Sequence, residues 1–389
     1  MKVLLTHRYF VPDSAPYGVI LHKIVKDLAA AGHDVEVFTS LPSYGRNKSK
    51  APRLEHMGEI LIRRVWVLAE ANRNPIVRVF NVLVYCISLF FYILRARADV
   101  VSAATFPPVL AAWTASLAAR LCGARFVYHV QDIHPEVSIY SGGRLGRGLL
   151  SRLLVLLDNQ TLRRASAIVT LSEDMADTLR ARNLGMLPIT LINNPALGLN
   201  GDLVAPPPEL VKAAGTTRVI FAGNLGRFQN LSLLAEGVAL CFDSYPELEL
   251  MFLGDGMVLS ELKARWGDHP QVRFAPFLPF AQAQGIIKGA DIGLVSLSSN
   301  IYRVAYPSKI STYLDLGLRI LALVEPKSQI ARYIKQHATG AVPDNATPEA
   351  IREALESLLT TAPCSIIAPT DRTAWPSLLA RLEVPNKTR

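Results

Sequence analysis

The stretch PPPELVKAAGTTRVIFAGNLG, residues 206–226, decides the fold class of this 389-residue chain. Three prolines interrupt the chain, and an apolar run of strand length at 218–222 follows them and leads into two glycines. Short apolar runs alternate with helical stretches before this break, and the same alternation starts again after it. Buried strands alternating with helices are typical of a parallel sheet covered on both faces. The sequence therefore predicts an α/β protein of two doubly wound, Rossmann-like domains.

The domain boundaries follow from this restart. We expect an N-terminal domain at 1–195, a linker at 196–215, a second domain at 216–368 and a tail at 369–389 that either crosses back to the first domain or frays. The expected strands are 3–6, 34–39, 61–67, 100–103, 125–130, 167–170 and 190–192, then 218–222, 248–253, 272–275, 292–296 and 320–324. Because open parallel sheets bind ligands beyond the carboxyl ends of their strands, a cleft between the two facing domains is the expected ligand site.

The charge is distributed unevenly between the two halves. Residues 1–195 hold 23 Lys and Arg against 14 Asp and Glu, whereas the rest of the chain holds 18 of each, so the net charge of +9 belongs to the first half. This excess predicts an anionic partner there, either membrane lipid or nucleic acid. We expect no nucleic acid, because no basic strip interleaved with aromatic residues and no known motif is present. Four widely spaced cysteines indicate neither zinc nor disulfides and fit a reducing cytosol.

The segment 79–94 is almost wholly apolar. Sixteen helical residues would span about 24 Å against a hydrocarbon core of about 30 Å, so we expect no membrane crossing. Its less apolar positions recur on one stripe of a helix: Arg78, Asn81, Tyr85, Ser88, Tyr92 and Arg95. Two interpretations stay open, a helix packed on a sheet and a helix lying in lipid headgroups, and Leu89 and Phe90 are the positions that we would test. The basic segment 46–50 is either a solvated loop or a second lipid contact.

Polar side chains gather where the strand at 125–130 ends. His129, Gln131 and Asp132 lie within four residues of one another, and a buried carboxylate costs free energy unless it is paired or used. The alternative is that Asp132 caps the next turn and His129 is a core histidine with satisfied hydrogen bonds. Gly18, at the start of the first helix, would let the backbone approach an anionic ligand.

Two loops of the second domain predict a diphosphate cradle. Gly223, Asn224, Gly226 and Arg227 follow the strand at 218–222, where glycines free backbone amides and arginine can grip a phosphate. Ser308 is the expected N-cap of a later helix, with Lys309 in its first turn, and a cation there opposes the helix dipole unless an anion lies nearby. No dinucleotide fingerprint, no P-loop and no metal-ligand spacing is present.

These features together resemble a known family. The chain resembles GT-B glycosyltransferases of family 4, of the bacterial colanic-acid, capsule and O-antigen type, over nearly its whole length. The resemblance rests on YFVP (9–12), AGHDVEV (31–37), DVV (99–101), FPP (106–108), HVQD (129–132), AGNLG (222–226), GDG (254–256) and PSK (307–309).

The resemblance implies a function and a set of roles. It implies retaining sugar transfer in surface polysaccharide synthesis, without metal or cofactor, from a UDP- or GDP-linked sugar to a polyprenyl-diphosphate-linked or saccharide acceptor. It also implies a peripheral location at the cytoplasmic face of the membrane. Arg227 and Lys309 would hold the diphosphate, and Asp132, with His129 and Gln131, would face the sugar and the acceptor hydroxyl.

The chain departs from the wider family at Gln131, where many relatives have a histidine, and at a pair of glutamates. An E-x7-E pair, whose second glutamate binds ribose, is replaced here by Val304 and Thr312. Thr312 can still form a hydrogen bond to the ribose, but it brings no carboxylate. Two other functions therefore stay open, a sugar-nucleotide epimerase of the same fold and an inactive relative that binds a partner enzyme.

Overall fold

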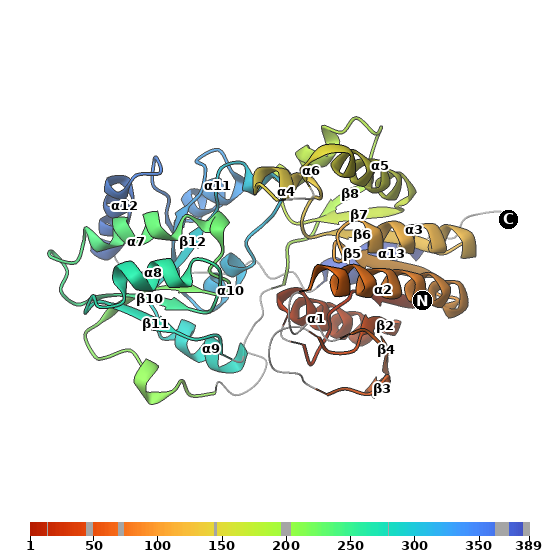
Figure 1. Ribbon diagram of the computed structural model, residues 1–389, viewed down its shortest axis with the longest axis horizontal. Coiled ribbons are helices and arrows are strands. Elements are labelled where there is room, and N and C mark those ends of the chain that lie inside the picture. Colours follow the sequence, from red (N-terminus) through yellow and green to blue (C-terminus); the bar gives the residue numbers. More distant parts are fainter. Residues whose placement is uncertain are drawn as a thin grey trace. The chain divides into compact units, whose positions relative to one another are not determined.

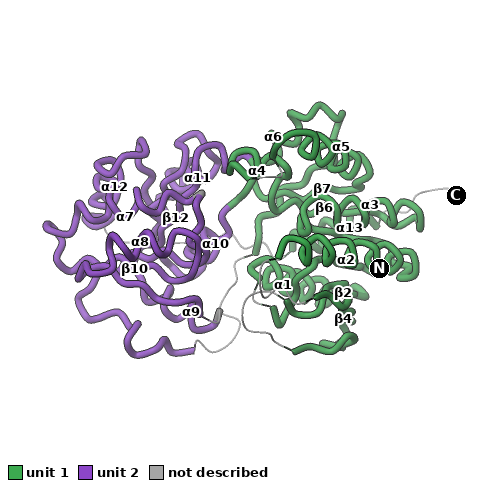
Figure 2. The backbone as a smooth tube through the Cα atoms, viewed as in Figure 1, with its two compact units in different colours: residues 1–195, 304–306, 370–389 green, residues 196–303, 307–369 purple. Residues whose placement is uncertain are grey.

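The computed structural model divides the chain into two compact units, which Figure 2 shows in different colours. Unit 1 comprises Met1–Pro195, Val304–Tyr306 and Thr370–Arg389, and unit 2 comprises Ala196–Arg303 and Pro307–Pro369. The structure describes residues 1–13, 15–43, 50–68, 74–143, 146–195, 204–278, 280–361 and 373–383. Most of the predicted basic loop at 46–50, residues 196–203 of the predicted linker, Cys364 and both ends of the predicted tail lie outside these residues.

Unit 1 contains an eight-stranded sheet of order β3-β4-β2-β1-β5-β6-β7-β8. Its strands are β1 (Lys2–Thr6), β2 (Asp34–Ser40), β3 (Leu54–Met57), β4 (Ile60–Val65), β5 (Val100–Ala104), β6 (Arg125–Val130), β7 (Ala167–Thr170) and β8 (Ile189–Leu191). All seven predicted strands are confirmed to within two residues. The prediction missed β3, a short edge strand that pairs antiparallel to β4 and has no fully buried residue.

Helices cover both faces of this sheet (Figure 1). They are α1 (Pro16–Ala30), α2 (Pro75–Ala96), α3 (Leu110–Cys122), α4 (Glu136–Tyr140), α5 (Gly148–Arg164), α6 (Glu173–Arg180) and α13 (Ala374–Glu383). From β4 through β5 and β6 to β7 the chain advances along the sheet in one direction. Because each of these crossovers is right-handed, α2, α3 and α5 lie on the same face, and α3 contacts both of the others. The crossover from β1 to β2 runs the opposite way, so α1 lies on the other face, where α13 contacts it.

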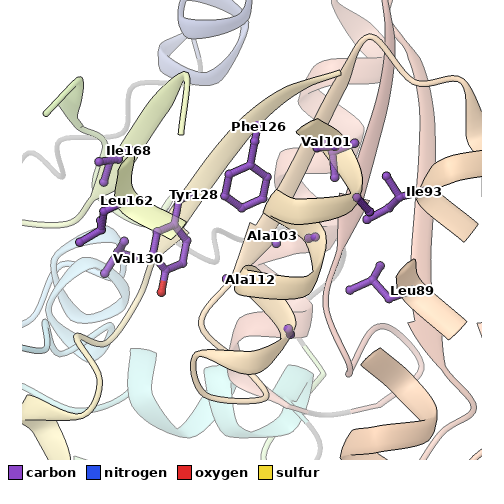
Figure 3. Packing of buried hydrophobic residues seen from close by; sticks show 14 of the residues in the cluster. Leu89, Ile93, Val101, Ala103, Ala112, Phe126, Tyr128, Val130, Leu162 and Ile168 are labelled. Carbon is purple, nitrogen blue, oxygen red and sulfur yellow. The ribbon is translucent and has the colours of Figure 1, made fainter. Parts of the chain in front are cut away.

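The main core of unit 1 lies between the sheet and the layer of α2, α3 and α5. Figure 3 shows Leu89 and Ile93 of α2, Ala112 of α3 and Leu162 of α5 among the buried side chains of β5, β6 and β7. Alternation along β6 sends successive side chains to opposite faces. The Tyr128 hydroxyl points to this layer and donates to Asp158 on α5 at 2.7 Å, so His129, the next residue, faces the side of α1 and α13.

Helix α2 is longer than predicted. It begins after Asn74, whose side chain accepts from the backbone N–H of Ile76, and it ends at Ala96 before a left-handed Arg97. Its 22 residues span about 33 Å, so the predicted helix length was wrong, and the expectation that it does not cross a membrane no longer rests on length. Within the described residues it is the helix that is long and apolar enough for a crossing by length and composition.

Unit 2 contains a second parallel sheet, of order β11-β10-β9-β12-β13-β14. Its strands are β9 (Thr217–Ala222), β10 (Leu248–Leu253), β11 (Val272–Ala275), β12 (Ile292–Ser296), β13 (Arg319–Leu323) and β14 (Gly340–Ala341). Its helices are α7 (Leu231–Ala239), α8 (Leu259–Trp266), α9 (Phe280–Lys288), α10 (Lys309–Asp315), α11 (Gln329–Gln336) and α12 (Pro348–Thr360). The five predicted strands are confirmed, and the two-residue β14 was missed. The strand order reverses between β9 and β12 in this sheet, as it does between β1 and β5 in unit 1. Doubly wound sheets bind ligands at such reversals, beyond the carboxyl ends of the strands.

Candidate functional site

In unit 1, a hydrogen-bonded network surrounds His129 at the carboxyl end of β6. The Tyr17 hydroxyl on α1 lies 2.8 Å from His129 Nδ1, and the Gln131 side-chain amide nitrogen lies 2.6 Å from His129 Nε2. The Trp375 ring on α13 meets the imidazole edge to face, with centroids 4.9 Å apart. Burial lowers the pKa of His129 to about 3, so the ring is neutral at physiological pH.

The amide of Gln131 fixes how His129 carries its hydrogen. Its side-chain nitrogen donates to Asn194 Oδ1 at 3.0 Å, and its oxygen accepts from Asn194 Nδ2 at 2.8 Å. With the Gln131 nitrogen turned toward His129, the Nε2 atom of the ring accepts a hydrogen bond. The single hydrogen of the neutral ring then lies on Nδ1 and is donated to Tyr17, which leaves the Tyr17 hydroxyl hydrogen available to another acceptor.

Asp132 follows this network directly. Its backbone N–H donates to the Thr105 hydroxyl at 3.3 Å, and the residue forms a β-bridge with Ala305. Among the described residues its carboxylate receives no hydrogen bond, so the alternative that it caps the following turn is not seen. Desolvation raises the pKa of Asp132 to about 6. A carboxylate without a protein partner at a strand end is available to a ligand.

The glycine at position 18 has a structural explanation of its own. A Cβ atom at Gly18 would lie 3.1 Å from the carbonyl oxygen of Tyr9 and 3.4 Å from Cα of Phe10. The loop after β1 therefore packs directly on the first turn of α1. A role of Gly18 in binding a ligand stays a prediction.

In unit 2, Lys309 and Gly223 lie side by side. A Cβ atom at Gly223 would lie 3.1 Å from Lys309 Cε, and Gly223 has φ +120°, which L side chains rarely adopt. The Lys309 ammonium lies 3.7 Å from the centroid of the Phe221 ring and has no carboxylate partner among the described residues. Desolvation lowers the pKa of Lys309 to about 7. Helix α10, which carries Lys309, is held to β9 by a hydrogen bond of 2.9 Å from the backbone N–H of Ala222 to Tyr313 Oη.

The glycine-rich motifs at 222–226 and 254–256 pack against each other. A Cβ atom at Gly254 would overlap the carbonyl oxygen of Gly223, and one at Gly256 would overlap that of Leu225. The backbone N–H of Leu225 donates to the carbonyl of Asp255 at 2.9 Å. The second motif therefore supports the backbone of the first and fixes the loop next to Lys309.

The remaining predicted residues of the cradle differ in detail from expectation. Arg227 is exposed without an ion pair among the described residues, and it opens the short 3-10 helix Arg227–Gln229 rather than α7. The backbone N–H of Gly226 donates to the Gln229 side chain at 3.0 Å, and Asn224 is exposed beside Gly226. Among the contacts of the described residues, none joins Arg227 to Lys309.

The start of α10 corrects one further prediction. Ser308 occupies the N-cap position, but its side chain makes no capping hydrogen bond, because the residue itself has helical φ and ψ. Lys309 lies in the first turn, as predicted. Thr312, three residues further on, shares a face of α10 with Lys309 and is partly exposed.

The departure at Val304 has a physical reason. Val304 is fully buried in the core of unit 1, and its carbonyl accepts from the backbone N–H of Ile133 at 2.8 Å. A glutamate at this position would place a carboxylate among apolar side chains, which is unfavourable. Valine therefore suits the packing of this strap, Val304–Tyr306, on unit 1.

Sequence reasoning missed three partners of His129. The sequence predicted none of Tyr17, Asn194 and Trp375 as part of the site. The three come from distant parts of the chain, and no spacing between them marks a site. Within the described residues, no group of three or more His, Cys, Asp or Glu side chains is placed to hold a metal ion.

The comparisons with known proteins agree with this fold. Residues 17–195 match the glycosyl transferase 4-like domain. The match therefore likens residues 17–195 to a glycosyl transferase 4-like domain, and the two doubly wound units have the GT-B fold of solved glycosyltransferases such as WaaG.

Three relatives illustrate the likeness. The chain is 22% identical, over 85% of its own length and 85% of the relative's, to the putative colanic acid biosynthesis glycosyl transferase WcaI of Escherichia coli. It resembles the structure of WaaG, a glycosyltransferase involved in lipopolysaccharide biosynthesis, at 14% identity and a TM-score of 0.66, covering 98% of this chain and 100% of that one. It also resembles Anabaena HepE in complex with UDP and glucose, at 16% identity and a TM-score of 0.62, covering 98% and 99%.

Proposed function

We propose that this glycosyltransferase moves a sugar, with retention at the anomeric carbon, from a nucleoside-diphosphate sugar to an acceptor in bacterial surface polysaccharide assembly. The names of WcaI and WaaG support the polysaccharide role, and the UDP and glucose in HepE support the donor class. The observation that carries the proposal is the Lys309 ammonium, which lies beside Gly223 at the switch point of unit 2 without a carboxylate partner among the described residues.

Lys309 supplies the charge that the reaction requires. When the bond between the sugar C1 and the β-phosphate oxygen breaks, negative charge develops on the departing diphosphate. An ammonium fixed near that oxygen stabilises the transition state more than the ground state. Arg227 is the second phosphate ligand in this proposal, and the transfer needs neither a metal nor a cofactor.

Unit 1 binds the acceptor and the transferred sugar. The acceptor hydroxyl forms the new bond to C1 as the bond from C1 to the diphosphate breaks, and its proton passes to the Asp132 carboxylate. Asp132 is the carboxylate that accepts a hydrogen bond from this hydroxyl, and the Tyr17 hydroxyl donates to a sugar oxygen. The acceptor is a polyprenyl-diphosphate-linked saccharide, which matches the positive charge of the N-terminal half and a peripheral location at the cytoplasmic membrane face.

A titration with nucleotides tests the donor site. A ligand that binds only the folded state raises the apparent stability, so UDP, GDP, ADP, CDP and dTDP are compared by thermal shift, each with and without Mg²⁺. We expect one of them to stabilise the protein whether or not Mg²⁺ is present. A shift that needs Mg²⁺ would contradict the role given to Lys309.

The role of Lys309 is then measured with matched variants. Lys309→Ala should weaken binding of the preferred diphosphate about tenfold to a hundredfold, since a charged hydrogen bond contributes about 1.5–3 kcal/mol. Lys335→Ala, at an exposed lysine of α11, serves as the control and should leave the affinity unchanged. Equal affinities for the two variants would remove the cradle from the proposal.

A further inference from the structure

The outer face of α2 is an exposed apolar stripe. Six large apolar side chains recur at helical spacing and expose between 44% and 76% of their surface: Ile76, Val79, Phe80, Leu83, Ile87 and Phe91. A hollow lined by Pro75, Ile76, Val79, Phe80 and Leu83 opens on this stripe. The face that a surface helix normally gives to water is thus the apolar one.

Uncharged polar side chains of α2, such as Asn81 and Tyr92, face the protein instead. The buried Asn81 side chain donates to the carbonyl of Leu68 and accepts from its N–H, at 2.9 and 2.8 Å. The Tyr92 ring stacks on Phe38, with centroids 4.8 Å apart. Leu89 is fully buried in the core. Because this inner face is part of the packed domain, α2 cannot leave the domain to cross a bilayer without stripping its core.

The neighbouring helices also expose large apolar side chains. Figure 1 shows α3 running between α2 and α5, and α3 contacts both. Helix α5 exposes Leu149, Leu150, Leu153 and Leu156. Eleven of the 23 large apolar side chains that are exposed in the described part of the chain lie on α2, α3 and α5. We call the outer surface of these three helices the α2–α3–α5 face.

The charge of the α2–α3–α5 face distinguishes a second copy of the chain from an anionic surface as its partner. The three helices carry six arginines and a single acidic residue, Asp158, which is buried and bonded to Arg182 and Tyr128. The exposed arginines are Arg78, Arg95, Arg120, Arg152 and Arg163, and none forms an ion pair within the described residues. A self-complementary contact between two copies would bring these arginines together. An anionic surface with an apolar interior matches both the charge and the leucines.

We propose that the α2–α3–α5 face docks on an anionic lipid bilayer, with α2 and α5 lying in the headgroup plane and their apolar side chains in the acyl boundary. This deepens the peripheral location given above and rests on the proposed function for its biological meaning. Each arginine near an anionic surface strengthens binding about fivefold.

Vesicle flotation of the full chain tests this docking. The vesicles contain phosphatidylcholine alone or phosphatidylcholine and phosphatidylglycerol at three to one. We expect the wild type to float with the anionic vesicles and to release at high salt. The double variants Leu83→Glu/Ile87→Glu and Leu153→Glu/Leu156→Glu should each reduce vesicle binding at least tenfold. Leu240→Glu/Met257→Glu, at exposed positions of unit 2, is the matched control and should float as the wild type does.

The charge is tested separately, in case a leucine variant fails to fold. Arg78→Gln/Arg95→Gln changes only exposed positions at the two ends of α2 and should weaken flotation with the anionic vesicles about tenfold or more. The proposal would be overturned if this arginine variant floated as the wild type does. It would also be overturned if Leu83→Glu/Ile87→Glu and Leu153→Glu/Leu156→Glu both folded and still floated as the wild type does. A dimer in sedimentation that the leucine variants dissociate would overturn it as well, because the face would then join two copies.

Nucleotide affinity separates this proposal from the function on which it rests. Each variant is titrated with the diphosphate that the wild type binds. Wild-type affinity together with lost flotation supports docking and leaves the donor site intact. A wild type that floats but binds no nucleotide would keep the docking surface and overturn the donor site. A wild type that binds nucleotide but does not float with anionic vesicles would keep the donor site and overturn the docking surface.

Discussion

The ammonium of Lys309 lies 3.7 Å from the centroid of the ring of Phe221, which is on β9 two residues before Gly223. An aromatic face attracts a cation, but it replaces the lost hydration only in part. The pKa of Lys309 therefore falls to about 7 through desolvation, and a bound anion should restore it.

This relationship makes nucleotide binding depend on pH. Below pH 7 the amine is charged in the free protein, and above pH 7 binding must take up a proton. The affinity for the nucleoside diphosphate should therefore fall as the pH rises from 7 to 9, by up to about tenfold per unit. Calorimetry in buffers of different ionisation enthalpy measures the proton uptake. Lys309→Arg, which stays charged, should bind with an affinity that is flat over this range.

Gly223 can be tested against Gly317, a glycine that also has a positive φ but whose Cβ position has no neighbour within 4 Å. Alanine at Gly223 or at Gly317 would occupy a positive φ and should destabilise unit 2 by roughly 1–2 kcal/mol. Only the methyl group at position 223 meets Lys309, whereas nothing lies within 4 Å of the corresponding position at 317. Nucleotide affinity should therefore fall in Gly223→Ala and persist in Gly317→Ala. Titration and thermal unfolding are measured on both.

Asp132→Asn should stabilise the protein and stop transfer. Because the folded pKa of Asp132, about 6, exceeds the ordinary 3.8, the folded state holds this proton more tightly than the unfolded chain. The charged carboxylate lowers the free energy of unfolding. This loss is absent below pH 3.8, grows between pH 3.8 and 6, and is complete above pH 6. At pH 7.5 the variant should gain about 1 kcal/mol, after allowance for the partial exposure of the residue.

Unfolding curves of the wild type and Asp132→Asn between pH 4 and 8 check this prediction. The buried histidines act in the opposite direction, because burial lowers the pKa of His7 and of His129, so the wild type loses stability as the pH falls below 6.5. The difference between variant and wild type isolates Asp132. A variant that is less stable at pH 7.5, or one that still transfers sugar, would contradict the role of this carboxylate.

Tyr17→Phe should slow transfer without affecting the donor site. The change leaves the buried Nδ1–H of His129 without a partner, which costs about 1–3 kcal/mol of stability. We expect kcat/KM to fall roughly tenfold, while nucleotide affinity in unit 2 stays at the wild-type value. Tyr140→Phe, at an exposed tyrosine of α4, is the control and should change neither quantity.

The sequence predicted the sheets well because their strands are buried on both faces and read as continuous apolar runs. Leu248–Leu253 is buried at every position and was predicted to the residue. The misses are strands without that pattern, the half-exposed Leu54–Met57 and the two-residue Gly340–Ala341. The length of α2 was underestimated because only the apolar run 79–94 was counted, although the helix continues to Pro75 and Ala96 through Arg78 and Arg95.

The site was predictable in part for a similar reason. Lys309 and Gly223 each lie in a local motif, so the cradle could be proposed before its geometry was known. The partners of His129 could not be predicted, since Tyr17, Asn194 and Trp375 meet only when the chain has folded. The choice of Leu89 as a test of lipid contact was wrong, because helical periodicity identifies a stripe without saying which side faces the protein.

The return of α13 to unit 1 has a consequence for the order in which the protein is made. The ribosome releases the first 195 residues long before Ala374–Glu383, by roughly 10–40 s at about 5–20 residues per second. During that interval the ring of His129 lacks its contact with Trp375, and α1 lacks its contact with α13. The surroundings of His129 are therefore completed last, after unit 2 has already been translated, and no unfinished nascent chain carries a complete His129 network.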